Sequence, residues 1–158
     1  MRLVSKVQTS SVKIASKIMM AMGIYALVVS LFWIFLTEVM FVSDFAAYTG
    51  QSLSDAFADG SKSAELWFIA KRLIGVELLP ISLLMIFITP KSYSRGEKWS
   101  WYALLIAGII TWGSLIGYKV AIGYFEPTTS SMTFIIGAIL FAIGIVLPAK
   151  AFLSKKST

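Results

Sequence analysis

The chain has 158 residues and a formal net charge of +6; 58% of its residues are hydrophobic and only 14% are charged. Soluble globular domains are about a quarter charged, so this composition excludes an ordinary soluble domain. Cysteine and histidine are both absent, which excludes disulfides, Cys or His metal ligands and His proton relays within the chain.

Four apolar stretches are each about as long as the roughly 20 residues that a membrane-spanning helix needs. We predict spans at about 18–42, 66–89, 101–124 and 132–149, within one transmembrane domain of residues 1–158. The basic residues before the first span suit a short interfacial helix. The fold class is therefore an all-α membrane four-helix bundle.

The longest predicted connection covers residues 43–65, between the first two spans. Gly50 and Gly60 are natural breaks in this segment, and "SLSDAF" between them predicts a short helix capped by Ser52. Its aspartates could serve an enzyme that acts on lipid, but an acidic loop is more often a solvated face. We therefore assign no catalytic residue here.

The second span has recognisable start and stop signals. Ser61 or Ser63 can cap it, and Glu65 would lie in its first turn. Pro80 lies inside the span and predicts a kink, because proline removes one backbone hydrogen bond. A tight turn at Pro127 separates the third and fourth spans.

Basic residues are distributed unevenly about the spans and predict the orientation. Ten of them lie in the N-terminus, the 90–100 turn and the C-terminus: Arg2, Lys6, Lys13, Lys17, Lys91, Arg95, Lys98, Lys150, Lys155 and Lys156. We expect cytoplasmic termini, an external 43–65 loop and a multi-pass protein of the plasma membrane. The positive charge then faces lipid headgroups, and we expect no nucleic-acid partner.

Aromatic residues flank the third span at its predicted inner boundary. Tyr93, Trp99, Trp101 and Tyr102 are all within this short region. Rings with one polar atom favour the membrane interface, so we expect these four to anchor the helices there.

Charged residues inside the spans are the candidate site. Glu38, Glu77 and Lys119 each fall roughly 9–10 Å below the predicted outer boundary, with Lys71 and Arg72 just above. Such charges are expected to face inward and pair, so we predict Glu77 with Lys119. We likewise predict Glu38 with Arg72 or Lys71. The cluster could be a structural staple, a polar pocket open to the outside, or an interface with another subunit.

Small residues mark the expected packing faces of the last two spans. The third span contains Gly113-x-x-x-Gly117, and the fourth contains Gly137 and Gly144. Such spacing lets helix backbones approach closely, within one chain or between chains.

The stretch "YSRGEKWSWYALL", residues 93–105, resembles a turn in small four-helix bacterial and archaeal membrane proteins. In that set, a basic R-G-E-x-W-x-W-Y turn connects the second and third helices. "YTG" at 48–50 and "KRLIG" at 71–75 fit the same set. The layout is similar to families whose members often serve as partners of membrane oxidoreductases. The resemblance implies this architecture and, as a partner, a membrane oxidase or monooxygenase.

These observations favour a non-catalytic accessory or scaffold subunit that packs in a larger membrane complex. No catalytic pattern or cofactor ligand is visible, and four spans are few for a complete transporter. The alternative is a small homo-oligomeric transporter or channel that uses Glu38, Glu77 and Lys119 as its polar site. The expected partners are the lipid bilayer and other membrane subunits, or further copies of the chain.

Overall fold

The structure, a computed structural model, describes the backbone of residues 2–123 and 129–154. Over these residues the chain is helical and contains no strand. The elements are α1 (Arg2–Phe35), α2 (Thr37–Thr49), α3 (Leu53–Ala58), α4 (Lys62–Lys91), the 3-10 helix η1 (Tyr93–Arg95), α5 (Lys98–Ile122), α6 (Thr129–Val146) and α7 (Ala149–Ser154). The turn predicted at Pro127 lies outside the described residues.

Four helical segments are long and apolar enough to cross a membrane, which confirms the prediction of a multi-pass membrane protein. They are Ser10–Phe35, Lys62–Arg95, Lys98–Ile122 and Ser131–Ser154. The first ends seven residues earlier than the predicted span 18–42, because the helix breaks at Leu36. The residues expected to form a separate interfacial helix instead continue directly into α1.

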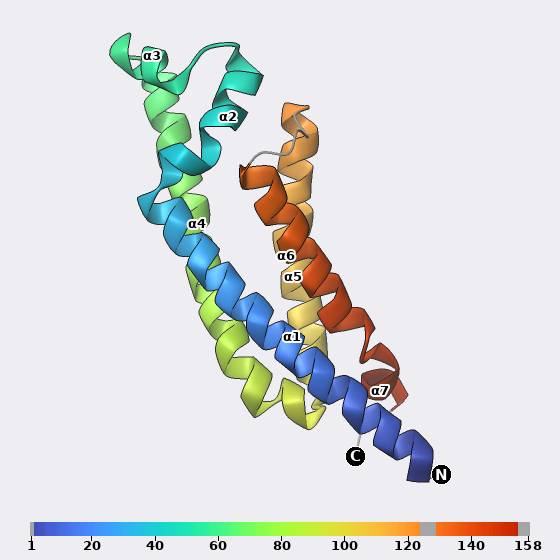
Figure 1. The fold of residues 1–158 in the computed structure, drawn as a ribbon. Coiled ribbons are helices and arrows are strands. Elements are labelled where there is room, and N and C mark those ends of the chain that lie inside the picture. Colours follow the sequence, from blue (N-terminus) through green and yellow to red (C-terminus); the bar gives the residue numbers. More distant parts are fainter. Residues whose placement is uncertain (1, 124–128, 155–158) are drawn as a thin grey trace.

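The helix α1 is the centre of the arrangement. It runs along α4 on one side and packs against α6 on the other, and α6 in turn packs against α5 (Figure 1). Contacts between α4 and α5 are few. The end of the bundle with α2 and α3 lies opposite the end with η1, α7 and the start of α1 (Figure 1).

The break between α1 and α2 positions the residues of the site. Leu36 has φ −122° and ψ 35°, outside the helical region. The hydroxyl of Thr37 donates a hydrogen bond back to the carbonyl of Trp33, and such back-bonding bends helices. Residues 43–49, which we predicted to be loop, belong to α2, and the short helix predicted within "SLSDAF" is α3.

The short-range signals in this region are confirmed. The Ser52 hydroxyl accepts a hydrogen bond from the backbone N–H of Asp55 and caps α3. Gly50 and Gly60 adopt positive φ angles of 72° and 69° and end the elements before them.

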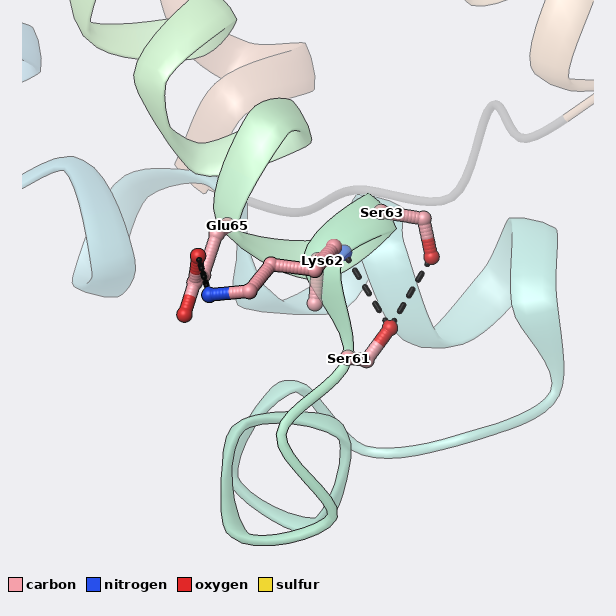
Figure 2. A network of polar contacts seen from close by, with 5 residues as sticks. Ser61, Lys62, Ser63 and Glu65 are labelled. Atoms are coloured by element: carbon pink, nitrogen blue, oxygen red, sulfur yellow. Dashed lines mark hydrogen bonds and ion pairs between the residues drawn. The ribbon is translucent and has the colours of Figure 1, made fainter.

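The Ser61 hydroxyl accepts from the backbone N–H of Ala64 and caps α4. Figure 2 shows this cap, with the hydroxyls of Ser61 and Ser63 in contact and Lys62 paired to Glu65 at 2.8 Å. From this start, α4 continues to Lys91 through both of its prolines.

Two aromatic side chains complete the hydrogen bonding at the end of α6. In an uninterrupted helix the N–H of residue 148 would donate to the carbonyl of Gly144, but residue 148 is a proline and has no N–H. The Tyr93 hydroxyl donates to that carbonyl instead. The indole N–H of Trp101 donates to the carbonyl of Ile145 at 3.0 Å.

The rings of Tyr93 and Trp101 are consequently buried against Phe152 of α7. We expected all four aromatic residues of this region to anchor the membrane interface. Only Trp99 and Tyr102 are exposed, as an anchoring ring must be. The other two join the end of α6 to η1 and α5.

Gly75 permits the close crossing of α4 and α1. A methyl group added there would lie 2.9 Å from Cβ of Trp33 and 3.0 Å from the backbone oxygen of Ser30. Because backbone atoms cannot yield without separating the helices, we expect Gly75→Ala to lower the free energy of unfolding by about 1–3 kcal/mol. Unfolding in mild detergent, followed by tryptophan fluorescence, measures this change.

Gly113→Ala is the matched control, because a Cβ there meets nothing within 4 Å. We expect no loss of stability from that variant. Equal losses from the two alanine variants would contradict the close crossing of α1 and α4.

Candidate functional site

A buried ion pair joins α2 to α5. Lys119 Nζ lies 2.7 Å from Asp44 Oδ1, and the hydroxyl of Tyr118 donates to Asp44 Oδ2 at 3.0 Å. Asp44 is 1% exposed and Lys119 is 3% exposed. Both carboxylate oxygens of Asp44 therefore have hydrogen-bond donors, which a buried carboxylate requires.

Lys71 of α4 brings a second ammonium group to the same place. Its Nζ lies 3.3 Å from the ring centre of Tyr118 and 5.5 Å from the ring centres of Phe41 and Trp67. Within the described part of the chain it forms no ion pair. Aromatic faces attract cations, and the attraction grows where water is excluded. The cluster of Asp44, Lys71, Tyr118 and Lys119, here called the buried charge cluster, thus ties α2, α4 and α5 together.

The sequence of α2 explains why Asp44 turns inward. The buried residues of α2 are Thr37, Met40, Phe41, Asp44 and Phe45. Their spacing is that of one face of an amphipathic helix. Asp44 thus occupies a core position of α2, beside Phe41 and Phe45, whose rings contact Trp67 of α4.

The predicted cluster divides into two groups in the structure. Lys71 and Lys119 are buried and lie near each other, whereas Glu38, Arg72 and Glu77 are exposed. Lys119 pairs with Asp44 rather than with Glu77. The guanidinium of Arg72 lies over the ring of Phe68 at 5.0 Å, and neither Glu38 nor Glu77 forms an ion pair with a described residue.

Sequence reasoning missed Asp44 because it placed residue 44 in an external acidic loop. The signal that could have found it is the apolar spacing of residues 37–45, which predicts a helix with Asp44 on its buried face. The pairing of Lys119 with Glu77 was wrong, because the chain bends at Leu36 and α2 brings Asp44 to Lys119.

The four predicted packing glycines also divide into two groups. A Cβ at Gly137 would collide with the ring of Trp112, and one at Gly144 would collide with the sulfur of Met19. A Cβ at Gly113 or Gly117 would meet nothing within 4 Å. Gly137 and Gly144 thus pack inside the bundle, whereas Gly113 and Gly117 lie on its outer surface.

A groove of about 260 Å³ runs between α4 and α5, where these helices have few contacts. We call it the α4–α5 groove. Apolar side chains form most of its lining, Trp33 of α1 contributes to it, and its polar members include Glu77, Thr111 and Ser114. The Ser114 hydroxyl donates to the carbonyl of Ile110 at 2.6 Å, and the indole nitrogen of Trp33 is buried without a hydrogen-bond partner among the described residues.

Comparison of the chain with family models, with curated proteins and with solved structures finds no match. The resemblance of the 93–105 turn to small four-helix membrane proteins therefore stays a prediction. Over the part of the chain that the structure describes, no three acidic side chains gather in a way that could hold a metal ion.

Neutralising Asp44 tests the buried ion pair. Asp44→Asn leaves Lys119 charged and without its carboxylate in a low-dielectric site, so we expect a loss of about 3–5 kcal/mol in the free energy of unfolding. Adding Lys119→Met removes the stranded charge and should restore part of that loss. Unfolding of the purified protein in mild detergent measures both effects.

Asp55→Asn provides the matched control, because Asp55 is exposed at the start of α3. Its effect should stay within about 0.5 kcal/mol. If the double variant at positions 44 and 119 lost the sum of the two single losses, the two charges would not be coupled.

Proposed function

We propose that this protein is a non-catalytic accessory or scaffold subunit that packs against the helices of other proteins in the membrane. The observation that carries the proposal is the α4–α5 groove, an open seam with an exposed carboxylate in the middle of a membrane-spanning helix. The groove brings an exposed carboxylate to an open, largely apolar seam between two membrane-spanning helices.

The position of Glu77 makes a purely lipid-facing role unfavourable. It lies close to midway between Lys62 and Lys91, so about 20 Å of helix separates it from either end of α4. The hydrocarbon core of a bilayer is about 30 Å thick, so a residue this far from both helix ends lies within it. An acidic side chain there costs about 2.5–3.5 kcal/mol on insertion scales unless other groups surround it.

The outer surface of α5 beside the groove is suited to a helix contact. Gly113 and Gly117 are exposed, and Ser114 lies between them along the chain. Small residues at this spacing allow a second backbone to come close, which strengthens van der Waals packing in lipid. The groove and this small-residue surface form one continuous face for a partner.

The alternative is a small homo-oligomeric transporter or channel with Glu38, Glu77 and Lys119 in one polar site. Lys119 is hydrogen-bonded to Asp44 in the buried charge cluster, while Glu77 is exposed in the α4–α5 groove. Because Lys119 is already paired with Asp44 and not with Glu77, we favour the accessory role. The proposal that the partner is a membrane oxidase or monooxygenase rests only on the resemblance of the 93–105 turn.

For the orientation, we propose cytoplasmic termini in the plasma membrane. Basic residues gather in η1, in α7 and at the end of α4, including Lys91, Arg95 and Lys150. Such an excess of Lys and Arg favours the cytoplasmic side.

Filling the small-residue surface tests the proposed function. Gly117→Leu adds a bulky side chain at an exposed position, where a Cβ would meet nothing within 4 Å. We therefore expect the fold to survive and the native assembly to fall apart. The assembly size is measured on a native gel after gentle extraction from the source membrane. Ala142→Leu, at an exposed position of α6, is the control and should leave the assembly intact.

If wild-type protein instead migrates as a small multiple of 17.4 kDa with no other chain, the accessory role is wrong. That outcome would favour the homo-oligomeric transporter or channel.

Cysteine labelling tests the orientation cleanly, because the chain has no cysteine of its own. With a membrane-impermeant maleimide on intact cells, we expect Ser54→Cys on α3 to be labelled and Ser94→Cys in η1 to be protected. Permeabilised cells, in which both should react, provide the control. The reverse labelling pattern would place the termini outside.

A further inference from the structure

The carboxylate of Glu77 makes no hydrogen bond or ion pair with any residue that the structure describes. Its neighbours in the groove are apolar chains such as Ile74, Leu78 and Ile81, together with hydroxyl groups across the seam. A carboxylate in hydrocarbon requires donors, and a cation provides the strongest ones. No described residue provides such a donor to the carboxylate of Glu77, which lies near the middle of α4.

We propose that a transmembrane helix of a different protein lies in the α4–α5 groove and places a Lys or Arg side chain beside Glu77. This inference rests on the proposed accessory function and names the chemistry of its partner. The apolar lining suits the hydrophobic sides of such a helix. The unpaired carboxylate of Glu77 requires that this helix carry a Lys or Arg at the same depth.

Charge is the reason that the partner is a different protein and not a second copy. In a two-fold contact about an axis along the membrane normal, equal depths meet, so Glu77 would face Glu77 of the other copy. Like charges in a low-dielectric environment repel strongly. The large side chains that α5 and α6 expose near their midpoints are aliphatic, with Ile109 and Ile139 as examples, and offer no positive charge.

Arg72 is the exposed cation nearest to Glu77 along α4, but it does not pair with the Glu77 carboxylate. It lies five residues before Glu77, about 7–8 Å further along α4 and roughly 140° around the helix. Its guanidinium already lies over the ring of Phe68. Since no described cation pairs with Glu77, we infer that another molecule provides the positive charge.

Photo-crosslinking in the native membrane tests the inference. A benzophenone amino acid replaces Ser114 or, separately, Ile110 of the groove, and Ala142 on α6 is the control position. Mass spectrometry then identifies the cross-linked peptide. We expect both groove positions to capture the same apolar segment of another protein, with a Lys or Arg within one helical turn of the attachment point.

Charge exchange provides the second measurement. Glu77→Lys should lower the yield of that cross-link at least about tenfold, because it places two cations together in the membrane. Changing the partner's basic residue to Glu should restore the cross-link yield when it is combined with Glu77→Lys. The same change should not do so in combination with wild-type Glu77. Glu65→Lys, an exposed change in the first turn of α4, controls for the added charge and should have no effect.

The outcomes that would contradict the inference differ in whether they also contradict the proposed function. Capture of a segment without a basic residue, or an unchanged yield with Glu77→Lys, overturns the inference while leaving the accessory function standing. Capture of this chain's own α4 or α5 overturns the inference in favour of a second copy. Capture of lipid alone overturns both the inference and the proposed function.

Discussion

The buried ion pair between Asp44 and Lys119 is the interaction on which the α2 end of the structure depends. Two charges removed from water gain nothing unless their geometry is good and their remaining hydrogen-bonding groups are satisfied. The hydroxyl of Tyr118 donates a hydrogen bond to the second carboxylate oxygen of Asp44, and the ammonium of Lys71 lies over the Tyr118 ring. The bend at Leu36 is what brings Asp44 to this position. Local geometry and long-range pairing therefore support each other.

Two kinds of intramembrane charge follow from this arrangement. The buried charge cluster is satisfied within the chain and holds α2, α4 and α5 together. Glu77 is exposed at mid-helix and has no described partner. The first kind stabilises the fold, and we propose that the second kind is paired by another molecule. This contrast separates the structural charges from the charge that we assign to function.

Features determined by neighbouring residues could be predicted from the sequence. The four spans, the caps at Ser52 and Ser61 and the breaks at Gly50 and Gly60 all depend on local composition. The partner of Lys119 could not be predicted from depth, because it depends on the bend at Leu36. The glycines show the same limit: Gly113 and Gly137 look alike in sequence, but only tertiary packing brings Trp112 against Gly137.

We propose that, in the native assembly, a helix of another protein lies in the α4–α5 groove with a cation beside Glu77. Cryo-electron microscopy of the chain in its native assembly, extracted with its surrounding lipid, tests this claim most directly. We predict helical density along the groove and a Lys or Arg side chain within ion-pair distance of the Glu77 carboxylate. A groove that contains only lipid acyl chains would contradict the account.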